Sequence, residues 1–363
     1  MPDNQPLLTI AIPTYNRSIF LAELLANLEP QLAVEKRVEL IVSNNASTDQ
    51  TAEVVASFQA RGMAIRYLCN TQNVGPEQNF FSCFHAAVGE YVWIFGDDDL
   101  LTANALHQIL SLLEQGEAEG GFDLCYLSSF GFTGQYHPPK ETVLKDKLGR
   151  FAEVVCDGEY FLEKVNILLV TISANIVNKR RLEATKYPAV EHLEGTYVPQ
   201  LAWIFPMIHE RCRILYVWER FLAYRQLNSG GWNFWDVFGV TVERIAREYF
   251  VREPFLAEAF INGVSRYYML GAVFDLRRQN SGVAVKQVVE RLRPVLGNNW
   301  RFWVYVVPVA LFPFWIARPL YWLLHGTNRL TRAMQTMFRH FGRAEQLLEP
   351  GMPTEVIKFE ARQ

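Results

Sequence analysis

The sequence predicts an α/β protein in which helices flank a mostly parallel central sheet, followed by a mainly helical C-terminal extension. Short apolar runs rich in β-branched and aromatic residues alternate with segments of helical periodicity up to about residue 128. Each apolar run ends in a polar cluster at the point where a helix begins. Beyond the turn-forming Ser229-Gly-Gly231, the periodicity becomes helical almost throughout.

Five strands are predicted in the first part of the chain, at residues 7–12, 38–42, 65–68, 91–95 and 124–128. Helices separate them, and in the first helix the apolar residues recur at three- and four-residue spacing, which defines one buried face: Leu21, Leu24, Leu25 and Leu28. Right-handed crossovers between parallel strands bring their carboxyl ends to one rim. The polar clusters are therefore expected together at that rim, where ligands bind in such sheets.

The remaining elements follow from the same patterns. Residues 132–150 are predicted to form a polar loop, 157–170 a helix, 171–177 a strand and 214–224 a strand pair. The extension is predicted to contain helices at 237–251, 255–277 and 283–296. We place the domain boundary so that residues 1–228 form the first domain and residues 229–363 the second.

Composition narrows the class of protein. A formal net charge of −3 over 363 residues gives no indication of a nucleic-acid partner. The five cysteines contain no C-x-x-C pair, which argues against a disulfide framework or a zinc site and fits a reducing compartment. The polar residues 1–6 do not form a signal peptide, so a cytoplasmic location is expected.

Three consecutive carboxylates, Asp97, Asp98 and Asp99, follow the apolar run that begins at Tyr91. Adjacent carboxylates repel one another and resist burial. A divalent cation would remove this repulsion, and hard oxygen ligands suit Mg²⁺ or Mn²⁺. The alternative is a solvated acidic turn that caps the helix expected at 102–114.

The extension contains an apolar, aromatic segment at 300–324 and a basic amphipathic helix at 328–348. Residues 302–317 carry no charge, but they are shorter than a usual membrane span and contain two prolines. Tryptophan, tyrosine and arginine are typical of helices that lie at a membrane surface. We therefore expect membrane-surface attachment; the alternative is a hydrophobic helical pair that packs on the first domain or in a dimer.

Four motifs in succession carry a resemblance: Ile12-Pro-Thr-Tyr-Asn-Arg17, Ser43-Asn-Asn-Ala-Ser-Thr-Asp49, Asn73-Val-Gly-Pro76 with Asn79, and Gly96-Asp-Asp-Asp99. They resemble the signatures of family 2 glycosyltransferases, which have the Rossmann-like GT-A fold. Asn73 to Phe80 and Gly89 to Trp93 are more specifically similar to the abequosyltransferase-like branch, which adds sugars to bacterial O-antigen units. The match is close over the first third of the chain and loose up to Tyr224.

The resemblance implies roles for individual residues. Those expected at the nucleotide sugar are Pro13, Thr14, Tyr15, Arg17, Asn44, Asn73, Asn79, Asp97 and Asp98. Asp99 and Asp97 are expected to hold Mn²⁺ or Mg²⁺, and Asp98 is also assigned to the catalytic set. For Arg17, a solvated side chain at a helix start is nearly as good an interpretation as a phosphate contact. Gln78 stands where many relatives carry Arg, which puts a diphosphate contact there in doubt.

Asn44 departs from the family pattern, because relatives usually have Asp at this position, accepting the N3–H of uracil. An amide donates as well as accepts. Since N3 of cytosine is an acceptor, Asn44 favours a cytidine nucleotide, although thymidine and uridine stay open through the amide oxygen. The expected donor is thus a CDP-, UDP- or TDP-linked sugar.

An inverting transferase needs a base for the acceptor hydroxyl. The resemblance places a carboxylate in the turn before Tyr197, where Glu194 and Glu191 are candidates and His192 is a weaker one. The clear Glu-Asp pair of many relatives is missing, so inversion and retention both stay open.

The expected function is transfer of a hexose or deoxyhexose from a nucleotide-diphosphate sugar to a lipid-linked saccharide acceptor in bacterial surface polysaccharide (O-antigen or capsule) synthesis. The expected place is the cytoplasmic face of the bacterial inner membrane. One alternative is a non-catalytic nucleotide- or glycan-binding scaffold that keeps the fold. The other is a sugar-nucleotide pyrophosphorylase, which needs a loop rich in Gly and Arg or Lys after the first strand, and residues 13–17 do not form one.

Overall fold

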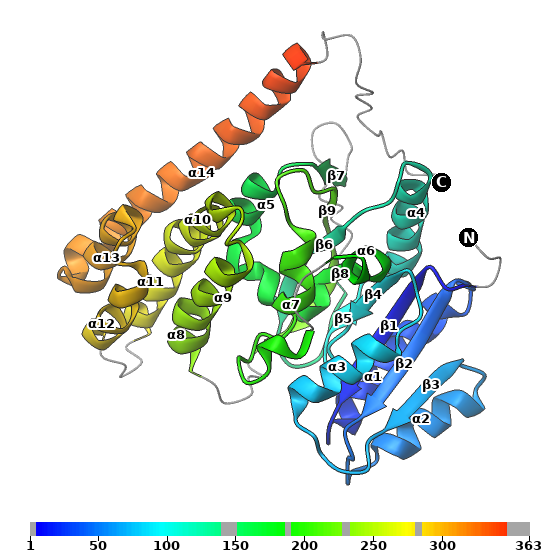
Figure 1. Ribbon diagram of the computed structural model, residues 1–363. Helices are drawn as coiled ribbons and strands as arrows, with labels where there is room; N and C mark the ends of the chain where they lie inside the picture. The colour runs from blue at the N-terminus through cyan, green and yellow to red at the C-terminus, as the bar shows by residue number, and fades with distance from the viewer. Residues whose placement is uncertain (1–4, 139–150, 186–189, 227–232, 280–284, 347–363) are drawn as a thin grey trace. The chain divides into compact units, whose positions relative to one another are not determined.

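The computed structural model describes residues 5–138, 151–185, 190–226, 233–279 and 285–346 (Figure 1). These residues divide into two compact units. The first contains residues up to 158 together with 169–226, and the second contains residues 159–168 together with 233–346. The predicted boundary at 228/229 and most of the predicted loop at 132–150 lie outside the described residues.

The first half of the sheet is parallel, in the order β3-β2-β1-β4. Its strands are β1 (Leu8–Thr14), β2 (Val38–Asn44), β3 (Ile65–Cys69) and β4 (Tyr91–Ile94). All four were predicted, since each is a short apolar run bounded by turn formers. The register pairs Thr14 with Asn44, so β1 and β2 end side by side.

Helices connect these strands: α1 (Ser18–Leu32), α2 (Thr51–Ala60), α3 (Pro76–Ala86) and α4 (Ala105–Ala118). The buried residues of α1 are the four leucines at helical spacing. Helix α3 packs on β1, β2 and β4, and α1 packs against α2 and α4. Gly75 precedes α3 with a φ of +88°, a conformation that glycine adopts without strain.

The second half of the sheet is mixed, so the mostly parallel arrangement that the sequence predicted describes the first half. It contains β8 (Asn175–Asn178), β6 (Leu124–Phe132), β9 (Ile214–Arg225), β5 (Leu100–Leu101) and β7 (Ala152–Val155). Strand β8 runs antiparallel to both β4 and β6, and β9 pairs antiparallel with β5 and β7. The predicted strand pair at 214–224 is the single long strand β9. Pairing between segments far apart in the chain leaves no local pattern that could reveal these directions.

Short helical segments fill the connections of this half. They are α5 (Gly158–Val165), η1 (Asn166–Val170), η2 (Ile172–Ala174), α6 (Lys179–Glu183), η3 (Val190–Leu193), α7 (Leu201–Ile204) and η4 (Phe205–Met207). Segment η2 leads into β8, and the Nε1–H of Trp93 on β4 donates to the carbonyl oxygen of Ser173 in η2 at 2.8 Å. This bond fixes η2 beside the end of β4.

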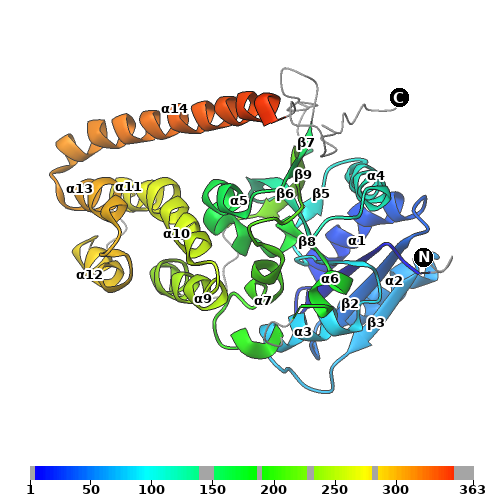
Figure 2. The same cartoon turned by 45° about the horizontal axis from the view of Figure 1, so that its top comes forward.

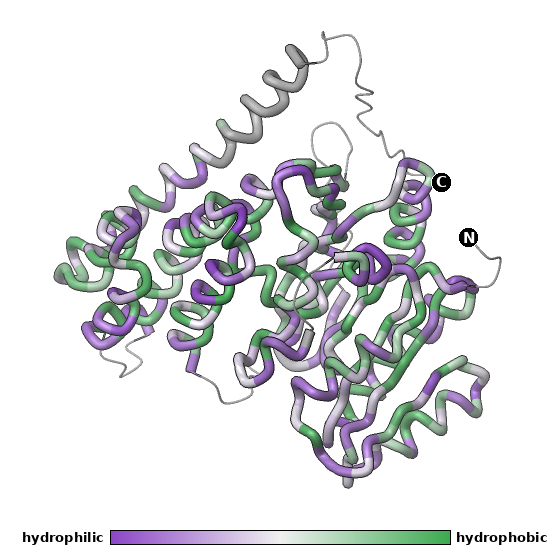
Figure 3. The backbone as a smooth tube through the Cα atoms, viewed as in Figure 1, coloured by the Kyte–Doolittle hydropathy of each residue, from purple (hydrophilic) through white to green (hydrophobic). Residues whose placement is uncertain are grey.

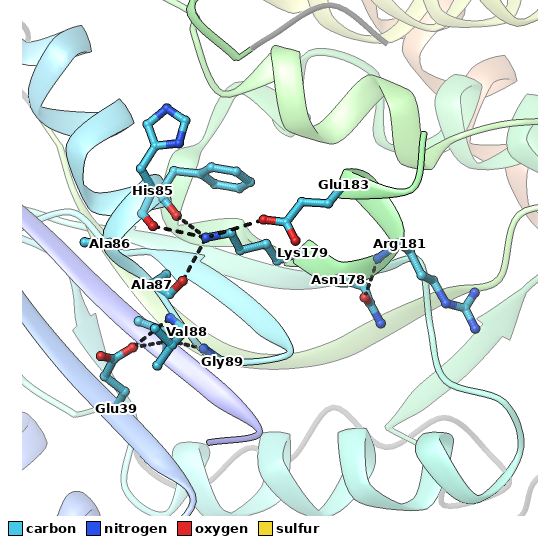
Figure 4. A network of polar contacts seen from close by, with 12 residues as sticks. Glu39, His85, Ala86, Ala87, Val88, Gly89, Asn178, Lys179, Arg181 and Glu183 are labelled. Carbon is cyan, nitrogen blue, oxygen red and sulfur yellow. Dashed lines mark hydrogen bonds and ion pairs between the residues drawn. The ribbon is translucent and has the colours of Figure 1, made fainter. Parts of the chain in front are cut away.

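Lys179 fastens the C-terminal end of α3 to the segment that follows β8. Its ammonium group donates to the carbonyl oxygens of Phe84 (3.0 Å), His85 (3.2 Å) and Ala87 (2.8 Å), as Figure 4 shows. These three bonds use all the donors of a lysine side chain. The last carbonyls of a helix have no intrahelical partner and favour a cation. Lys179 thereby stabilises the position of the C-terminal end of α3 next to α6.

The second unit is helical, as predicted. Its segments are α8 (Phe234–Asp236), η5 (Val237–Thr241), α9 (Val242–Tyr249), α10 (Pro254–Gly263), η6 (Val264–Met269), α11 (Leu270–Arg278), α12 (Val285–Leu296), η7 (Phe302–Val306), α13 (Val307–Leu311) and α14 (Phe314–Gln346). Figure 2 shows α14 as one long helix, which begins inside the predicted apolar segment 300–324, after η7 and α13, and contains the described part of the predicted helix 328–348. Within the described residues, no helix has the length and apolar character required to cross a membrane.

We predict that Lys179→Gln lowers the free energy of unfolding by about 2 kcal/mol, because three carbonyl groups lose a charged donor. Urea unfolding followed by circular dichroism measures this change. The matched control is Lys36→Gln at an exposed position, for which we expect a change within about 0.5 kcal/mol. Equal effects of the two substitutions would contradict the role assigned to Lys179.

Candidate active site

The carboxyl ends of β1 and β4 bring Thr14 against the acidic triplet. Strand β4 pairs with β1 up to Ile94, and the backbone N–H of Phe95 then donates to Ala11. The chain turns at Gly96, which places Asp97 beside the end of β1. The hydroxyl of Thr14 donates to Oδ2 of Asp97 at 2.8 Å, and both side chains are buried.

Arg17 lies between two of the three carboxylates. Its Nε is 3.1 Å from Oδ1 of Asp97, and its Nη2 is 2.5 Å from Oδ2 of Asp98. The Arg17 side chain is 30% exposed, whereas Asp97 is almost fully covered. The guanidinium also lies 5.1 Å from the ring centre of Phe20. Arg17 is therefore part of the acidic site, and a solvated arginine at a helix start does not describe it.

Asp99 is held by residues from the second half of the sheet. Its Oδ2 accepts from the Ser173 hydroxyl at 2.6 Å, and its Oδ1 accepts from the backbone N–H of Arg225 at 3.0 Å. The Ser173 oxygen in turn accepts from the N–H of Gly96 at 2.8 Å. Sequence reasoning missed both Ser173 and Arg225. No local signal marks Ser173, whereas Arg225 could have been suspected as a cation at the end of the last strand.

The Arg225 side chain extends this network. Its Nη2 is 2.5 Å from Oε2 of Glu23 on α1, and its Nε donates to the backbone oxygen of Asp98 at 3.3 Å. The guanidinium lies over the rings of Phe20 and Phe132 at 5.0 and 4.5 Å. Arg225 therefore ties the acidic turn to α1 and to β6.

Burial dominates the electrostatics of the triplet. It raises the pKa of Asp97 to about 7, although Arg17 and Thr14 act in the opposite direction. Burial and the charge of Asp98 likewise raise the pKa of Asp99 to about 7, against the hydrogen bond from Ser173. The folded protein thus holds two carboxyl groups whose charged forms are unfavourable.

A divalent cation is implied by the fold family, and the donor chemistry of the triplet fits one. Carboxylate oxygens are the ligands that Mg²⁺ and Mn²⁺ prefer, and a cation would stabilise the charged forms of Asp97 and Asp99. In this structure Arg17 supplies the positive charge to Asp97 and Asp98. Among the described residues, no group of three or more His, Cys, Asp or Glu side chains converges as a metal site. A cation at the triplet would therefore share these carboxylates with Arg17.

Asn44 is buried at the end of β2, and both the nitrogen and the oxygen of its side-chain amide are hydrogen-bonded. Its Nδ2 donates to the hydroxyl of Tyr67 at 2.7 Å, and its Oδ1 accepts from the backbone N–H of Ser47 at 2.9 Å. Each end of the amide keeps one further hydrogen-bonding position. Nearby, Tyr15 is 40% exposed. Asn44 thus ends β2, Tyr15 directly follows β1, and Tyr67 lies on the adjacent strand β3.

Asn73 is exposed and Asn79 is buried, and both side chains are hydrogen-bonded within the protein. The Nδ2 of Asn45 donates to Oδ1 of Asn73 at 2.8 Å, and Asn45 also bonds the backbone of Val74 and Gly75. Asn79 accepts from the Ser43 hydroxyl at 2.6 Å and donates to the Ser43 carbonyl at 3.0 Å. These bonds shape the loop before α3. Sequence reasoning missed the central role of Asn45 in it.

One carboxylate joins the beginnings of α1 and α2. Asp49 accepts from the backbone N–H groups of Ser18 (2.9 Å) and Thr51 (3.1 Å). Burial opposes its charge, but the hydrogen bonds from Thr51 and Ser18 outweigh burial and lower its pKa. Asp49 thus contributes to helix starts, in agreement with the capping preference of aspartate.

The two candidate bases lie at different places along α3. Glu191 is 2.5 Å from Nε2 of His85, near the C-terminal end of α3 and the amino end of β4. Glu194 precedes a turn whose Gly195 and Tyr197 N–H groups donate to the Glu77 carboxylate, in the first turn of α3. That end of α3 adjoins the loop held by Asn45. The structure therefore places the Glu194 turn at the first turn of α3 and Glu191 near the C-terminal end of this helix.

Most of the sequence that forms the site matches a known protein family. Residues 9–170 match the model of Glycosyl transferase family 2. This segment contains all four motifs and the acidic triplet. This part of the chain is therefore a family 2 glycosyltransferase domain, as the motifs predicted.

Two curated relatives show the kind of protein in which this domain occurs. Abequosyltransferase RfbV of Salmonella typhimurium is 38% identical over 109 residues, which is 30% of this chain and 33% of that protein. The GalNAc(5)-diNAcBac-PP-undecaprenol beta-1,3-glucosyltransferase of Campylobacter jejuni is 34% identical over 115 residues, 31% of this chain and 36% of that protein. The match thus spans about a third of the length of these relatives.

A solved structure confirms the fold over most of the chain. The crystal structure of Staphylococcus aureus TarS 1-349 in complex with UDP-GlcNAc has a TM-score of 0.54 at 16% identity. It covers 89% of this chain and 92% of the TarS chain. The expected GT-A fold is confirmed.

We predict that Asp99→Asn stabilises the protein at about pH 8 by on the order of 2 kcal/mol. The folded pKa of Asp99, about 7, lies above the ordinary value of 3.8. The protonated Asp99 therefore makes its full contribution to the stability of the folded state at pH values below 3.8, and this contribution is lost as the pH rises through about 7. The gain in Asp99→Asn should shrink towards about pH 5. Urea unfolding between these pH values measures it.

Asp49→Asn is the control for this prediction. Because the folded pKa of Asp49 is lowered, its charge contributes stability above its ordinary pKa, and that stability is lost as the pH falls. Asp49→Asn should therefore destabilise the protein at neutral pH, and less so in acid. A gain in Asp99→Asn that does not depend on pH would contradict the assignment.

Proposed function

We propose that this protein transfers a hexose or deoxyhexose from a nucleotide-diphosphate sugar to a lipid-linked saccharide in bacterial surface polysaccharide synthesis. The observation that carries the proposal is the junction of Thr14, Arg17 and the three carboxylates at the carboxyl ends of β1 and β4. This is the sheet edge at which ligands of α/β proteins bind. The abequosyltransferase and the undecaprenol-linked glucosyltransferase among the relatives support this substrate class.

The acidic site would manage the charge of the leaving nucleoside diphosphate. Asp99 and Asp97 would hold Mn²⁺ or Mg²⁺, which when bound neutralises that charge. Arg17 would move from the carboxylates to a phosphate oxygen, because a guanidinium suits both partners. Asp98 would then accept a hydrogen bond from a ribose hydroxyl. Thr14 keeps Asp97 in position throughout.

The base of the nucleotide would lie on the loops that follow β1 and β2, between Tyr15 and Asn44. Tyr15 offers an exposed ring for stacking. The Asn44 Nδ2 that donates to Tyr67 has a second hydrogen, which suits the acceptor N3 of cytosine. We therefore favour a CDP-linked donor over UDP- and TDP-linked ones. Asn73 and Asn79 would act through the loop that they support.

Glu194 is the general base that we favour. In the transfer step, the acceptor oxygen forms a bond to the anomeric carbon while the bond from that carbon to the diphosphate breaks. The hydroxyl proton passes to the Glu194 carboxylate, and the nucleoside diphosphate leaves with the bonding electrons. Tyr197 supports a functional turn here, since it is an exposed aromatic residue with a φ of +64°.

The proposed place of action is the cytoplasmic face of the bacterial inner membrane, where a lipid-linked acceptor is found at the bilayer surface. Two alternatives remain distinct in their chemistry. A non-catalytic scaffold would bind nucleotide or glycan without transfer. A sugar-nucleotide pyrophosphorylase would need a phosphate-cradling loop after β1, which Pro13 to Arg17 does not provide.

We predict that CDP raises the melting temperature more than UDP, TDP or GDP, and that Mn²⁺ increases the shift. A ligand that binds only the folded state stabilises it by mass action, about 2.7 kcal/mol at a hundredfold excess over Kd. In Asp99→Asn, the additional rise in melting temperature caused by Mn²⁺ should be lost. In Asn44→Asp, the nucleotide that gives the largest rise should change from CDP towards UDP. Preference of the wild type for UDP would refute the cytidine assignment, and no shift with any nucleotide would favour the scaffold.

We predict that Glu194→Gln lowers kcat by about a hundredfold or more, because general bases contribute roughly 10²–10⁴. Binding of the nucleotide should be unchanged. Glu191→Gln is the matched control, and it should keep kcat within about threefold because Glu191 contacts His85 at the other end of α3. Measurement of transfer with a lipid-linked acceptor fraction tests both variants. A larger loss in Glu191→Gln would reverse the assignment.

A further inference from the structure

The turn between α13 and α14 exposes five consecutive apolar residues. We call residues 311–315 the apolar corner. Trp315 is 77% exposed, Phe312 47% and Leu311 45%, and Pro313 and Phe314 are exposed as well. Figure 3 shows hydrophobic colour in this part of the chain. Soluble proteins rarely expose such a contiguous group without a partner.

Several backbone groups of the apolar corner are already hydrogen-bonded. Arg277 on α11 donates to the carbonyl oxygens of Val309 (2.6 Å) and Phe312 (2.7 Å). The N–H of Phe312 donates to the Pro308 oxygen, and the Pro313 oxygen accepts from Ile316 and Ala317. Proline has no N–H to satisfy. Unpaired backbone groups oppose the transfer of a segment out of water, so these bonds lower the cost of desolvating the apolar corner.

Aromatic packing between α11 and α14 supports the apolar corner. The Phe274 ring on α11 stacks on Tyr321 at 3.8 Å and on Phe314 at 5.9 Å. The Arg277 guanidinium lies 5.5 Å from the Phe314 ring centre. The corner is thus a supported projection of the helical unit, and its shape does not depend on a partner.

The exposed apolar surface continues along one face of α14. Trp322, Leu323 and Leu330 are 58%, 64% and 62% exposed. They follow Trp315 by seven, eight and fifteen residues, which are spacings that lie on one face of a helix. We call these three residues of α14 the stripe. The apolar corner and the stripe therefore form one surface along α13 and α14.

The chain segment that carries this surface has positively charged side chains only. From residue 299 to residue 344 the chain contains six arginines and no lysine, aspartate or glutamate. Of these arginines, Arg318 and Arg329 are exposed on α14. Two copies joined through this surface would bring the exposed Arg318 and Arg329 of each copy towards those of the other. An anionic lipid surface offers the missing negative charge.

We propose that the apolar corner inserts into the headgroup region of an anionic phospholipid bilayer, with the stripe of α14 lying along the bilayer surface. Tryptophan and arginine are the residues that suit this boundary. The corner enters the interface without crossing it. The contacts of the helical unit alone carry this inference, and the membrane acceptor in the proposed function agrees with it.

Flotation of the full-length protein with vesicles tests the inference. We expect binding to phosphatidylcholine vesicles that contain about one third phosphatidylglycerol, weak binding to pure phosphatidylcholine, and weakening by salt. Phe312→Ser with Trp315→Ser should reduce the bound fraction by roughly tenfold or more. The matched control is Val251→Ser with Phe255→Ser, two exposed apolar residues outside the corner and stripe, and it should bind like the wild type.

Three outcomes would overturn the proposal: no vesicle binding by the wild type, equal binding by the corner variant, or equal loss in the control. The rival interpretation is that two copies of the chain associate through this surface, and sedimentation velocity tests it. A dimeric wild type and a monomeric corner variant, with no vesicle binding by either, would make the surface a self-association site. The nucleotide-dependent melting shift reports on the first unit in the same variants. Failure of the membrane inference is therefore distinguishable from failure of the proposed transferase function.

Discussion

The burial of carboxylates at the end of β4 is the constraint on which the candidate site depends. Asp97 and Asp99 are buried, and burial raises the pKa of each to about 7. The protein offsets this unfavourable state with donors directed at both groups: Thr14 and Arg17 for Asp97, and Ser173 with the Arg225 backbone for Asp99. A divalent cation bound at this site would stabilise the charged forms of both carboxylates, which agrees with the proposed binding of a metal and a nucleoside diphosphate.

Side-chain hydrogen bonds, more than backbone ladders, shape the loops around the triplet. Asp49 joins the starts of α1 and α2, Asn45 holds the loop before α3, and Asn44 ties β2 to β3 through Tyr67. Asparagine and aspartate suit this work because their short side chains imitate backbone groups. The polar residues of the four motifs therefore divide into two groups, those that face the ligand edge and those that build it.

The helical unit solves a different problem, since it must expose apolar surface and stay folded in water. Arg277 covers the carbonyls of the α13–α14 turn, and Phe274 stacks beneath it. Arg318 and Arg329 give the exposed surface of α14 positive charge. Surface positive charge opposes self-association and favours anionic partners. Together with the proposed sugar-transfer site, such a surface agrees with the proposal that the acceptor is held in a membrane.

Local pattern was enough to predict the four parallel strands, the buried face of α1, the family and the acidic triplet, because periodicity and turn residues act over a few neighbours. The tertiary structure alone decided the antiparallel direction of β8, the recruitment of Ser173 and Arg225 to Asp99, and the separation of Glu191 from Glu194 along α3. Each of these depends on contacts between segments far apart in the chain. Such contacts follow from how the sheet closes and how α3 is anchored by Lys179, and no short stretch of sequence encodes them.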